Sequence, residues 1–403
     1  MFRFLTAGES HGKSLLAIIE GIPANLEIDI NFINHELSRR QKGYGRSERM
    51  TIENDKVEIL SGVRNGFTIG SPISILIHNK DWINWELSMG TEPVKNNDIE
   101  RIKAIESVKI TSPRPGHADL CGYFKFNQKD IRNVVERSSA RETCIRVAIG
   151  AIAKILLKEF NIKVFSHVLS IGGISVDRNI LPDNYDELIK NAEDSDLRCA
   201  CFKTTEKMKE LIDQIKEEGD SVGGIFEVIV TGVPIGLGSY TNWDKRLDGI
   251  LAQAIVSIPG VKGVEIGAGF KQAYLKSSDL QDEIMLENNK IKRKTNNAGG
   301  IEGGVSNGEP IILRGVIKPV ATIRKRFKTI DLGDLRETTS HFERADICVV
   351  PSAGVIAESM VSIILAQLMQ DKFGGNSIEE MKNNWKNYQE VCDEQISRGY
   401  AKI

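Results

Sequence analysis

The first segment that could do chemistry lies near the start of the chain, where Ser10 and His11 are flanked by Gly8 and Gly12. The pattern formally fits G-x-S-x-G, the turn that presents the nucleophilic serine of α/β-hydrolases. That turn needs a preceding central strand and an upstream loop for an oxyanion hole, and the seven residues before Gly8 cannot supply both. A Ser–His pair in a glycine-rich turn is instead suited to holding a phosphate or moving a proton.

Residues 39–50, with the sequence RRQKGYGRSERM, form an arginine-rich segment. Glycine allows the backbone to approach a ligand closely, and guanidinium groups make planar, bidentate contacts with phosphate and carboxylate. An anion site is therefore one interpretation, and an exposed basic loop is the other. RNA binding is disfavoured, because within this segment Tyr44 alone is available for stacking on bases.

Residues 137–143, with the sequence RSSARET, combine two hydroxyls with two arginines. Ser139 and Glu142 form an S-x-x-E capping box, which predicts a helix N-terminus. Free N–H groups and the positive end of the helix dipole favour an anion there. The alternative is a plain N-cap, worth about 1 kcal/mol to the fold.

Two other polar segments are ambiguous by themselves. A Pro-Gly turn would present His117 on a loop beside Arg114, although most loop histidines are simply solvated. Arg344 and Asp346 form an Arg-x-Asp pair ahead of a long apolar stretch, and such pairs are most often surface ion pairs. Residues 299–308 are glycine-rich but lack the order of a phosphate-binding P-loop.

The elements that must position these segments follow from hydrophobic periodicity and from helix start and stop signals. Strands and helices do not alternate regularly, which favours an α+β fold over a doubly wound sheet. The polar stretch 276–297 predicts a long surface loop or an irregular excursion. No linker divides residues 1–403, so we expect one domain. Helices are predicted over residues 31–41, 140–160, 203–220 and 355–372 and from Ser377 onward, and strands over residues 73–77 and 225–231.

Composition excludes several classes of protein. With 53 Lys and Arg against 55 Asp and Glu, the chain has no overall attraction to nucleic acid or acidic membranes. Of six cysteines only Cys199 and Cys201 are close in sequence, which predicts reduced thiols and no metal site. The N-terminus lacks the features of a signal peptide, and no apolar run approaches the roughly 20 residues that span a bilayer, so we expect a cytoplasmic protein.

Taken in order, the polar segments resemble the chorismate synthase family from about Phe4 to about Met360. The motifs that carry the resemblance include GESHG, GYGR, RPGHADL, RSSARET, VKGVEIG, GGIEGG and ERADIC. The family implies a homotetramer and a β-α-β sandwich of antiparallel sheets packed with long helices. It also implies a lyase of aromatic amino acid biosynthesis, the last step of the shikimate pathway. That enzyme makes chorismate by anti 1,4-elimination of phosphate from 5-enolpyruvylshikimate-3-phosphate, requiring reduced FMN without net redox change.

The resemblance also implies roles for single residues. His11 is similar to the histidine that protonates the leaving phosphate, with Ser10 beside it. His117 is similar to the histidine that protonates reduced flavin, and Asp346 to the aspartate that assists proton removal together with the flavin. The substrate anions would be bound by Arg40, Arg46, Arg49, Arg114, Arg141 and Arg344. FMN would be contacted by Arg137, Ser138, Ser139, Pro259, Gly260, Gly303, Lys318, Pro319, Val320, Ala321, Thr322 and Arg344.

Two rival functions make different predictions. A flavoprotein with net redox turnover, such as an NADPH-dependent flavin reductase, would need a dinucleotide site, for which Gly267 and Gly269 offer only a weak match. A protein that binds RNA through residues 39–49 would leave His11, His117 and Asp346 without a role. Some members of the family reduce their own flavin. No added reductase-like domain is visible here, so we expect an external flavin reductase.

Overall fold

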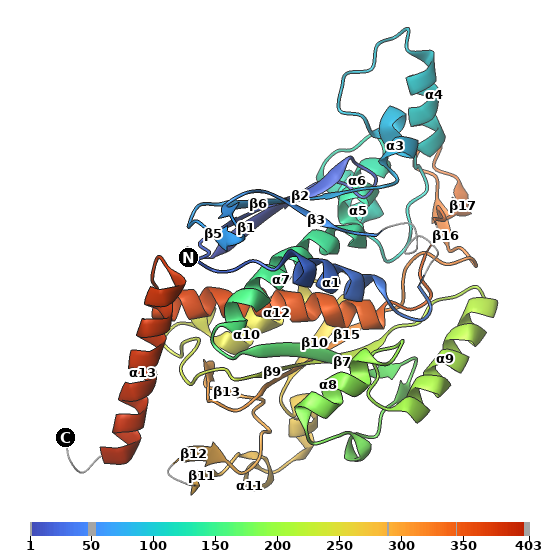
Figure 1. Ribbon diagram of the computed structural model, residues 1–403. Coiled ribbons are helices and arrows are strands. Elements are labelled where there is room, and N and C mark those ends of the chain that lie inside the picture. The colour runs from blue at the N-terminus through green and yellow to red at the C-terminus, as the bar shows by residue number, and fades with distance from the viewer. Residues whose placement is uncertain (1, 47–53, 288–289, 344, 399–403) are drawn as a thin grey trace.

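Two antiparallel sheets enclose a layer of helices (Figure 1). The computed structural model describes residues 2–46, 54–287, 290–343 and 345–398. The first sheet contains, in spatial order, β1 (Arg3–Ala7), β2 (Ser14–Glu20), β6 (Ile73–His78) and β3 (Val57–Ser61). The second sheet contains β10 (Val261–Ile266), β15 (Ile311–Ile317), β9 (Gly224–Thr231), β7 (Lys163–Ile171) and β8 (Ile174–Ser175). The predicted α+β class and its sandwich of sheets and helices are confirmed.

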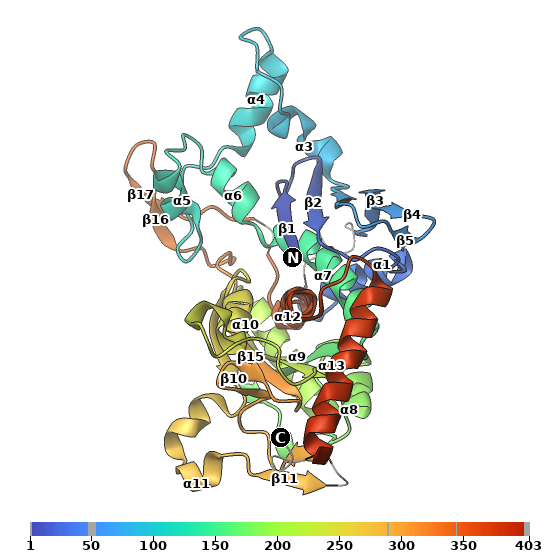
Figure 2. The same ribbon diagram turned by 90° about the vertical axis from the view of Figure 1, so that its left-hand side faces the viewer.

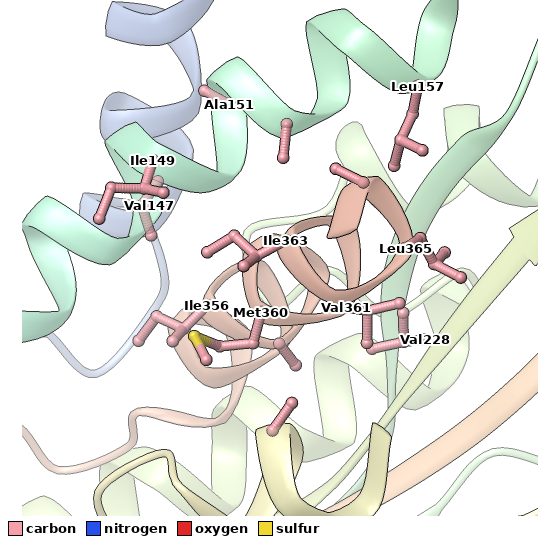
Figure 3. Packing of buried hydrophobic residues seen from close by; sticks show 14 of the residues in the cluster. Val147, Ile149, Ala151, Leu157, Val228, Ile356, Met360, Val361, Ile363 and Leu365 are labelled. Carbon is pink, nitrogen blue, oxygen red and sulfur yellow. The ribbon is translucent and has the colours of Figure 1, made fainter. Parts of the chain in front are cut away.

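The helical layer joins the two sheets into one hydrophobic core. Its members are α1 (Ile30–Gln41), α7 (Thr143–Lys158), α10 (Leu247–Val256) and α12 (Val350–Phe373). Helix α7 packs on β2 of the first sheet, whereas α12 packs on β7 and β9 of the second. Figure 3 shows the contact between α7 and α12, with Ile363 and Leu365 among the buried side chains of α12. The helices cross so closely that a Cβ on Gly150 would lie 2.3 Å from Ser359 Cβ.

The strands of the first sheet form because apolar side chains alternate along them. Leu15, Ala17 and Ile19 of β2 are fully buried, and so are Ile75 and Ile77 of β6. A period of two places all of them on the face that meets the helices. Burial of each large aliphatic side chain contributes about 1.5–3 kcal/mol, so the register that keeps this set inside is strongly favoured.

Helix α12 corrects one expectation from the sequence. By length and composition alone, Val350–Phe373 could span a membrane, so the statement that no apolar run is long enough was wrong. In the structure α12 is instead a core helix, with 83% of its most apolar stretch buried. The apolar side chains of α12 are covered by helices α7 and α10 on one side and by strands β7 and β9 on the other, where a membrane helix would contact lipid.

A buried ion network fixes the helical layer. Glu358 of α12 accepts hydrogen bonds from Arg39 (2.7 Å), Lys154 (2.5 Å), Arg198 (3.1 Å) and Ser166 (2.6 Å). Burial would raise the pKa of Glu358, but the surrounding cations hold it well below its usual range. The first arginine of the basic segment therefore faces the core, and the anion-loop interpretation does not apply to it.

The remaining elements lie around this sandwich. Helices α3 and α4 project from one end of the molecule, and the hairpin β11–β12 lies at the other (Figure 2). The other helices are α3 (Trp82–Met89), α4 (Ile99–Val108), α5 (Asp119–Lys125), α6 (Arg132–Ser138), α8 (Tyr185–Glu193), α9 (Phe202–Glu217), α11 (Ser277–Leu280) and α13 (Ile378–Arg398). The short strands are β4 (Val63–Arg64), β5 (Phe67–Thr68), β11 (Ile284–Glu287), β12 (Lys290–Arg293), β13 (Ile301–Glu302), β14 (Val305–Ser306), β16 (Lys328–Ile330) and β17 (Glu337–Thr339).

Two local predictions were wrong and two were confirmed. Residues 276–297 are not a plain loop, because they contain α11 and the hairpin β11–β12. The capping box at Ser139 does not form, because its Oγ accepts from the N–H of Arg141 at 3.2 Å and not from that of Glu142. The alternative of a plain N-cap is confirmed, since Ser139 caps a 3₁₀ turn, Ala140–Glu142, that precedes α7. The predicted start at Ser377 is confirmed, since Ser377 and Glu380 each accept from the backbone N–H of the other.

Candidate active site

A cavity of about 550 Å³ brings most of the predicted site residues together. Arg137 and Gly303 do not line it in the described part of the chain, and Arg49 and Arg344 lie outside the described residues. The predicted residues that do line it are Ser10, His11, Arg40, Arg46, Arg114, His117, Ser138, Ser139, Arg141, Pro259, Gly260, Lys318, Pro319, Val320, Ala321, Thr322 and Asp346.

The two residues outside the cavity have local structural contacts. Arg137 donates to the carbonyl of Gly8 at 3.0 Å and to Thr6 Oγ1 at 2.9 Å, and so fixes the loop that leads to Ser10. Gly303 lies in the turn between β13 and β14, where its carbonyl accepts from Arg246 at 3.1 Å. Arg137 therefore holds the loop that leads to Ser10, and Gly303 is separate from the cavity.

His11 is held on two sides. Its Nδ1 lies 2.8 Å from Glu136 Oε1, and its backbone N–H donates to Glu136 Oε2 at 2.7 Å. The indole of Trp85 stacks on the imidazole, with ring centroids 3.9 Å apart. Because His11 is buried at 7% exposure, these contacts leave the edge of the ring that bears Nε2 as the edge available to a ligand.

His117 has its own carboxylate partner. Its Nδ1 lies 2.5 Å from Asp119 Oδ1, at the start of α5. Arg114 donates from Nε to Asp119 Oδ2 at 2.8 Å and from Nη1 to Thr322 at 3.1 Å. Burial alone would raise the pKa of Asp119, but the hydrogen bonds from His117 and Arg114 hold it well below its usual range. Asp119 therefore stays ionised and orients the ring.

Asp346 reaches the cavity beside Arg46. Arg46 Nη1 lies 3.1 Å from Asp346 Oδ2, and both side chains are mostly buried. The carbonyl of Gly45 accepts from the N–H of Ile347 at 2.8 Å, which joins the end of the basic segment to the residues before α12. Gly45 has a φ of +85°, a conformation that favours glycine at this join.

Arg40 and Arg141 share one buried carboxylate. Arg141 Nη1 donates to Asp55 at 2.8 Å, and Arg40 Nη1 lies 3.7 Å from the same group. Burial would raise the pKa of Asp55, but its hydrogen bond from Arg141 and the two positive charges lower it. Among the described residues, Nη1 of Arg40 makes no hydrogen bond and is buried near Asp55, its ion-pair partner at 3.7 Å.

The cavity is positive in balance. Among the described residues that line it, six side chains are cationic and two, Glu343 and Asp346, are carboxylates. Asp55 and Asp119 lie behind the arginines and offset part of the excess. A low-dielectric pocket of this kind favours a ligand with several negative charges, because each charge can find a guanidinium or ammonium partner.

Sequence reasoning missed four residues of this site. Glu136 and Asp55 are single carboxylates with no local motif, and only the fold brings them to His11 and Arg141. Trp85 comes from α3, which projects from the body of the molecule. Lys262 lines the cavity and stands within VKGVEIG, so that motif was the one available signal.

The site can bind a polyanion and move protons at two places. Buried cations provide the first capacity, and two histidines with carboxylate partners provide the second, together with Asp346. Cys144 adds no nucleophile, since burial raises the pKa of its thiol to about 12 and Sγ–H donates to Asp55.

Comparison with known proteins gives a consistent result. The family model described as chorismate synthase matches residues 2–370. A chorismate synthase of Alkaliphilus metalliredigens is 53% identical over 392 residues, covering 97% of this chain and all of the relative. One of Carboxydothermus hydrogenoformans is 49% identical over 389 residues, covering 96% of this chain and 98% of the relative.

A crystal structure of a chorismate synthase superposes on this fold with a TM-score of 0.78 at 41% identity, covering 98% of each chain. Sequence, fold and the order of motifs therefore agree over nearly the whole length. This chain belongs to the chorismate synthase family of lyases.

Proposed function

We propose that this protein converts 5-enolpyruvylshikimate-3-phosphate into chorismate by anti 1,4-elimination of phosphate. The main observation behind the proposal is that His11, His117 and Asp346 line the same cavity as six cationic side chains. Membership of the family supports the reaction class. The rival in which residues 39–49 bind RNA fits less well, because Arg40 and Arg46 point into a buried cavity.

Substrate binding follows from charge. The substrate carries one phosphate and two carboxylates, and Arg40, Arg46 and Arg141 present guanidinium groups to the cavity. Burial of such an anion is favourable only where charge-assisted hydrogen bonds replace water. Holding all three anionic groups at once also fixes the ring against the catalytic side chains and excludes water.

Proton transfer is assigned to His11 and Asp346. His11 donates a proton to the leaving phosphate, with Ser10 beside it, and Asp346 assists removal of the ring proton. Asp346 is held by Arg46 at 3.1 Å, and His11 by Glu136 at 2.8 Å, so both groups are oriented before substrate binds. His117, which Asp119 orients, would protonate the cofactor.

The residues present fit reduced FMN. The apolar wall from Ile258 to Gly260 and the segment from Lys318 to Thr322 would hold it, with the hydroxyls of Ser138 and Ser139. Lys318 donates to the carbonyl of Gly116 at 2.5 Å, which joins that segment to the loop of His117. When bound, reduced FMN supplies an electron-rich ring that stabilises the charge developing as phosphate leaves.

An anaerobic assay of phosphate release tests the proposal. With 5-enolpyruvylshikimate-3-phosphate we expect release of phosphate only when chemically reduced FMN is added, and no net oxidation of the flavin. His11→Ala and Asp346→Asn should each lower turnover by about 10²-fold or more, the scale of general acid–base groups. Turnover within a few-fold of the unmodified protein in both variants would refute the assignments.

The proposal also covers the location of the protein, its oligomeric state and its supply of reduced flavin. We infer a cytoplasmic homotetramer supplied with reduced flavin by an external flavin reductase. The alternative, reduction by NADPH on this chain, predicts NADPH oxidation by the purified protein with FMN and without substrate. Absence of that oxidation, together with full activity on reduced FMN, is the expected result.

A further inference from the structure

A chain of alternating charges runs behind the cavity wall, away from the ligand side. Glu136 of α6 contacts His11 at 2.8 Å and Arg132 Nη1 at 3.4 Å. Arg132 Nη1 also donates to Glu343 Oε1 at 2.6 Å, and His341 Nε2 lies 3.3 Å from the same oxygen. Neither Glu136 nor Arg132 lines the cavity, so neither can act on the ligand directly.

Both carboxylate oxygens of Glu136 contact His11. The side chain of Glu136 is 1% exposed, and its two oxygens contact both the ring and the backbone N–H of His11. The backbone carbonyl of Glu136 also accepts from the N–H of Ser10 at 3.0 Å. An acidic acceptor at Nδ1 favours the tautomer with the proton on Nδ1 and leaves Nε2 for the ligand.

Arg132 connects this pair to the opposite side of the cavity. Glu343 belongs to the segment that carries Asp346, and it lines the cavity itself. Burial would raise the pKa of Glu343, but contacts with His341 and Arg132 hold it well below its usual range. Arg132 therefore lies between two carboxylates, Glu136 and Glu343.

Trp85 completes the support. Its ring stacks on His11 at 3.9 Å and also lies 5.3 Å from the guanidinium of Arg132. The indole N–H donates to Asp81 Oδ2 at 3.0 Å, which fixes the plane of the ring. The charged groups that contact His11 directly or through this support are Glu136 and Arg132 on α6 and Glu343 before α12.

We propose that Glu136 is a positioning residue, which keeps the proton of the neutral His11 ring on Nδ1 and turns Nε2 to the ligand, so that Nε2 takes up the second proton that the imidazolium then donates to the phosphate. Arg132 links Glu136 to Glu343, and so supports the carboxylate that holds His11. The kinetic part of this inference rests on the proposed function. The tautomer part does not, because it concerns the protein without substrate.

Two measurements on the full chain test the inference. In protein labelled with ¹⁵N-histidine, the chain has six histidines, so His11 can be assigned by its loss in His11→Ala. We expect the Nδ1-protonated form in the unmodified protein and in Glu136→Gln, whose amide oxygen still accepts. In Glu136→Ala the proton should redistribute toward Nε2. An unchanged tautomer in Glu136→Ala would overturn the proposal whether or not the protein is active.

Kinetics provide the second readout. Glu136→Ala should lower kcat by about 10- to 100-fold with KM nearly unchanged, as for other carboxylates that orient a histidine. In a His11→Ala background the same change should have little further effect, because the residue acts through His11. An equal fold-decrease in kcat in both backgrounds would show that Glu136 acts independently of His11 and would refute the proposal.

A matched control tests whether the loss of activity depends on the position of the carboxylate beside His11 or only on its burial. Glu227 is 5% exposed and contacts His167 at 3.1 Å and Arg314 at 2.8 Å, in the second sheet and outside the cavity. Glu227→Gln removes the charge of a buried carboxylate bonded to a histidine, as Glu136→Gln does. We expect kcat of Glu227→Gln to match that of the unmodified protein at 25 °C.

If the unmodified protein released no phosphate, the proposed function would be refuted. The NMR measurement would still decide which tautomer of His11 is present.

Discussion

The buried ion network around Glu358 makes a quantitative prediction about stability. The network contains three cations, Arg39, Lys154 and Arg198, and three carboxylates, of which Glu358 is fully buried. Replacement of Glu358 by Gln keeps the shape of the side chain but removes the charge that all three cations contact. The six-membered cluster then retains one uncompensated positive charge inside the helical layer.

The size of the effect follows from that uncompensated charge. Removal of one partner from a buried ion pair costs about 3–5 kcal/mol. Unfolding entropy near the midpoint is about 2.1 cal/mol/K per residue, hence about 0.85 kcal/mol/K for a 403-residue chain that unfolds cooperatively. Glu358→Gln should therefore lower Tm by about 4–6 °C.

Thermal unfolding followed by circular dichroism is the assay, with Glu193→Gln as the matched control. Glu193 belongs to the same network, through Arg39 and Arg198, but its side chain is 35% exposed and water can solvate what remains. We expect the control to lower Tm by about 1 °C or less. Equal shifts in the two variants, or a shift near zero for Glu358→Gln, would show that burial does not set the cost.

Two further predictions concern packing and pH. Gly150→Ala places a Cβ 2.5 Å from Ser359 Cα, so we expect a loss of about 1–3 kcal/mol and a Tm lower by about 1–4 °C, and an unchanged Tm would contradict the close crossing. Burial raises the pKa of Glu227, but contacts with His167 and Arg314 lower it to about 2. Because the folded pKa is depressed, this contribution is complete above the ordinary value of 4.5 and is lost as pH falls toward 2. The Tm difference between the unmodified protein and Glu227→Gln should shrink as pH falls below about 4.5, and a difference that grows over that range would refute the sign.

Most of the architecture could be predicted because local signals agreed with tertiary packing. The 31–41 and 225–231 segments form α1 and β9 with boundaries shifted by one residue at their N-terminal ends. Such segments carry a clear period, and burial on one face strengthens the same choice. Residues 276–297 failed as a prediction because an exposed hairpin buries few of its side chains, even the apolar ones, and backbone pairing holds it instead.

Within the site, the motifs indicated which residues point at the ligand but not which residues hold them. His11 and Asp346 are flanked by short recognisable sequences, whereas their partners lie far away in the chain. Glu136 is 125 residues from His11, and Arg132 is 211 residues from Glu343. A contact of that separation depends on how α6 docks against the β1–β2 turn and the segment before α12, so no local pattern encodes it.

The same logic explains why two adjacent arginines have different roles. Arg39 and Arg40 are neighbours in sequence and both lie in the last turn of α1. A helix turns by about 100° per residue, so consecutive side chains point in different directions. Arg39 therefore meets Glu358 in the core, while Arg40 reaches the cavity beside Asp55. An arginine-rich segment is one feature in sequence, but the helix divides it between stability and ligand binding, and substitution of each arginine should separate the two effects.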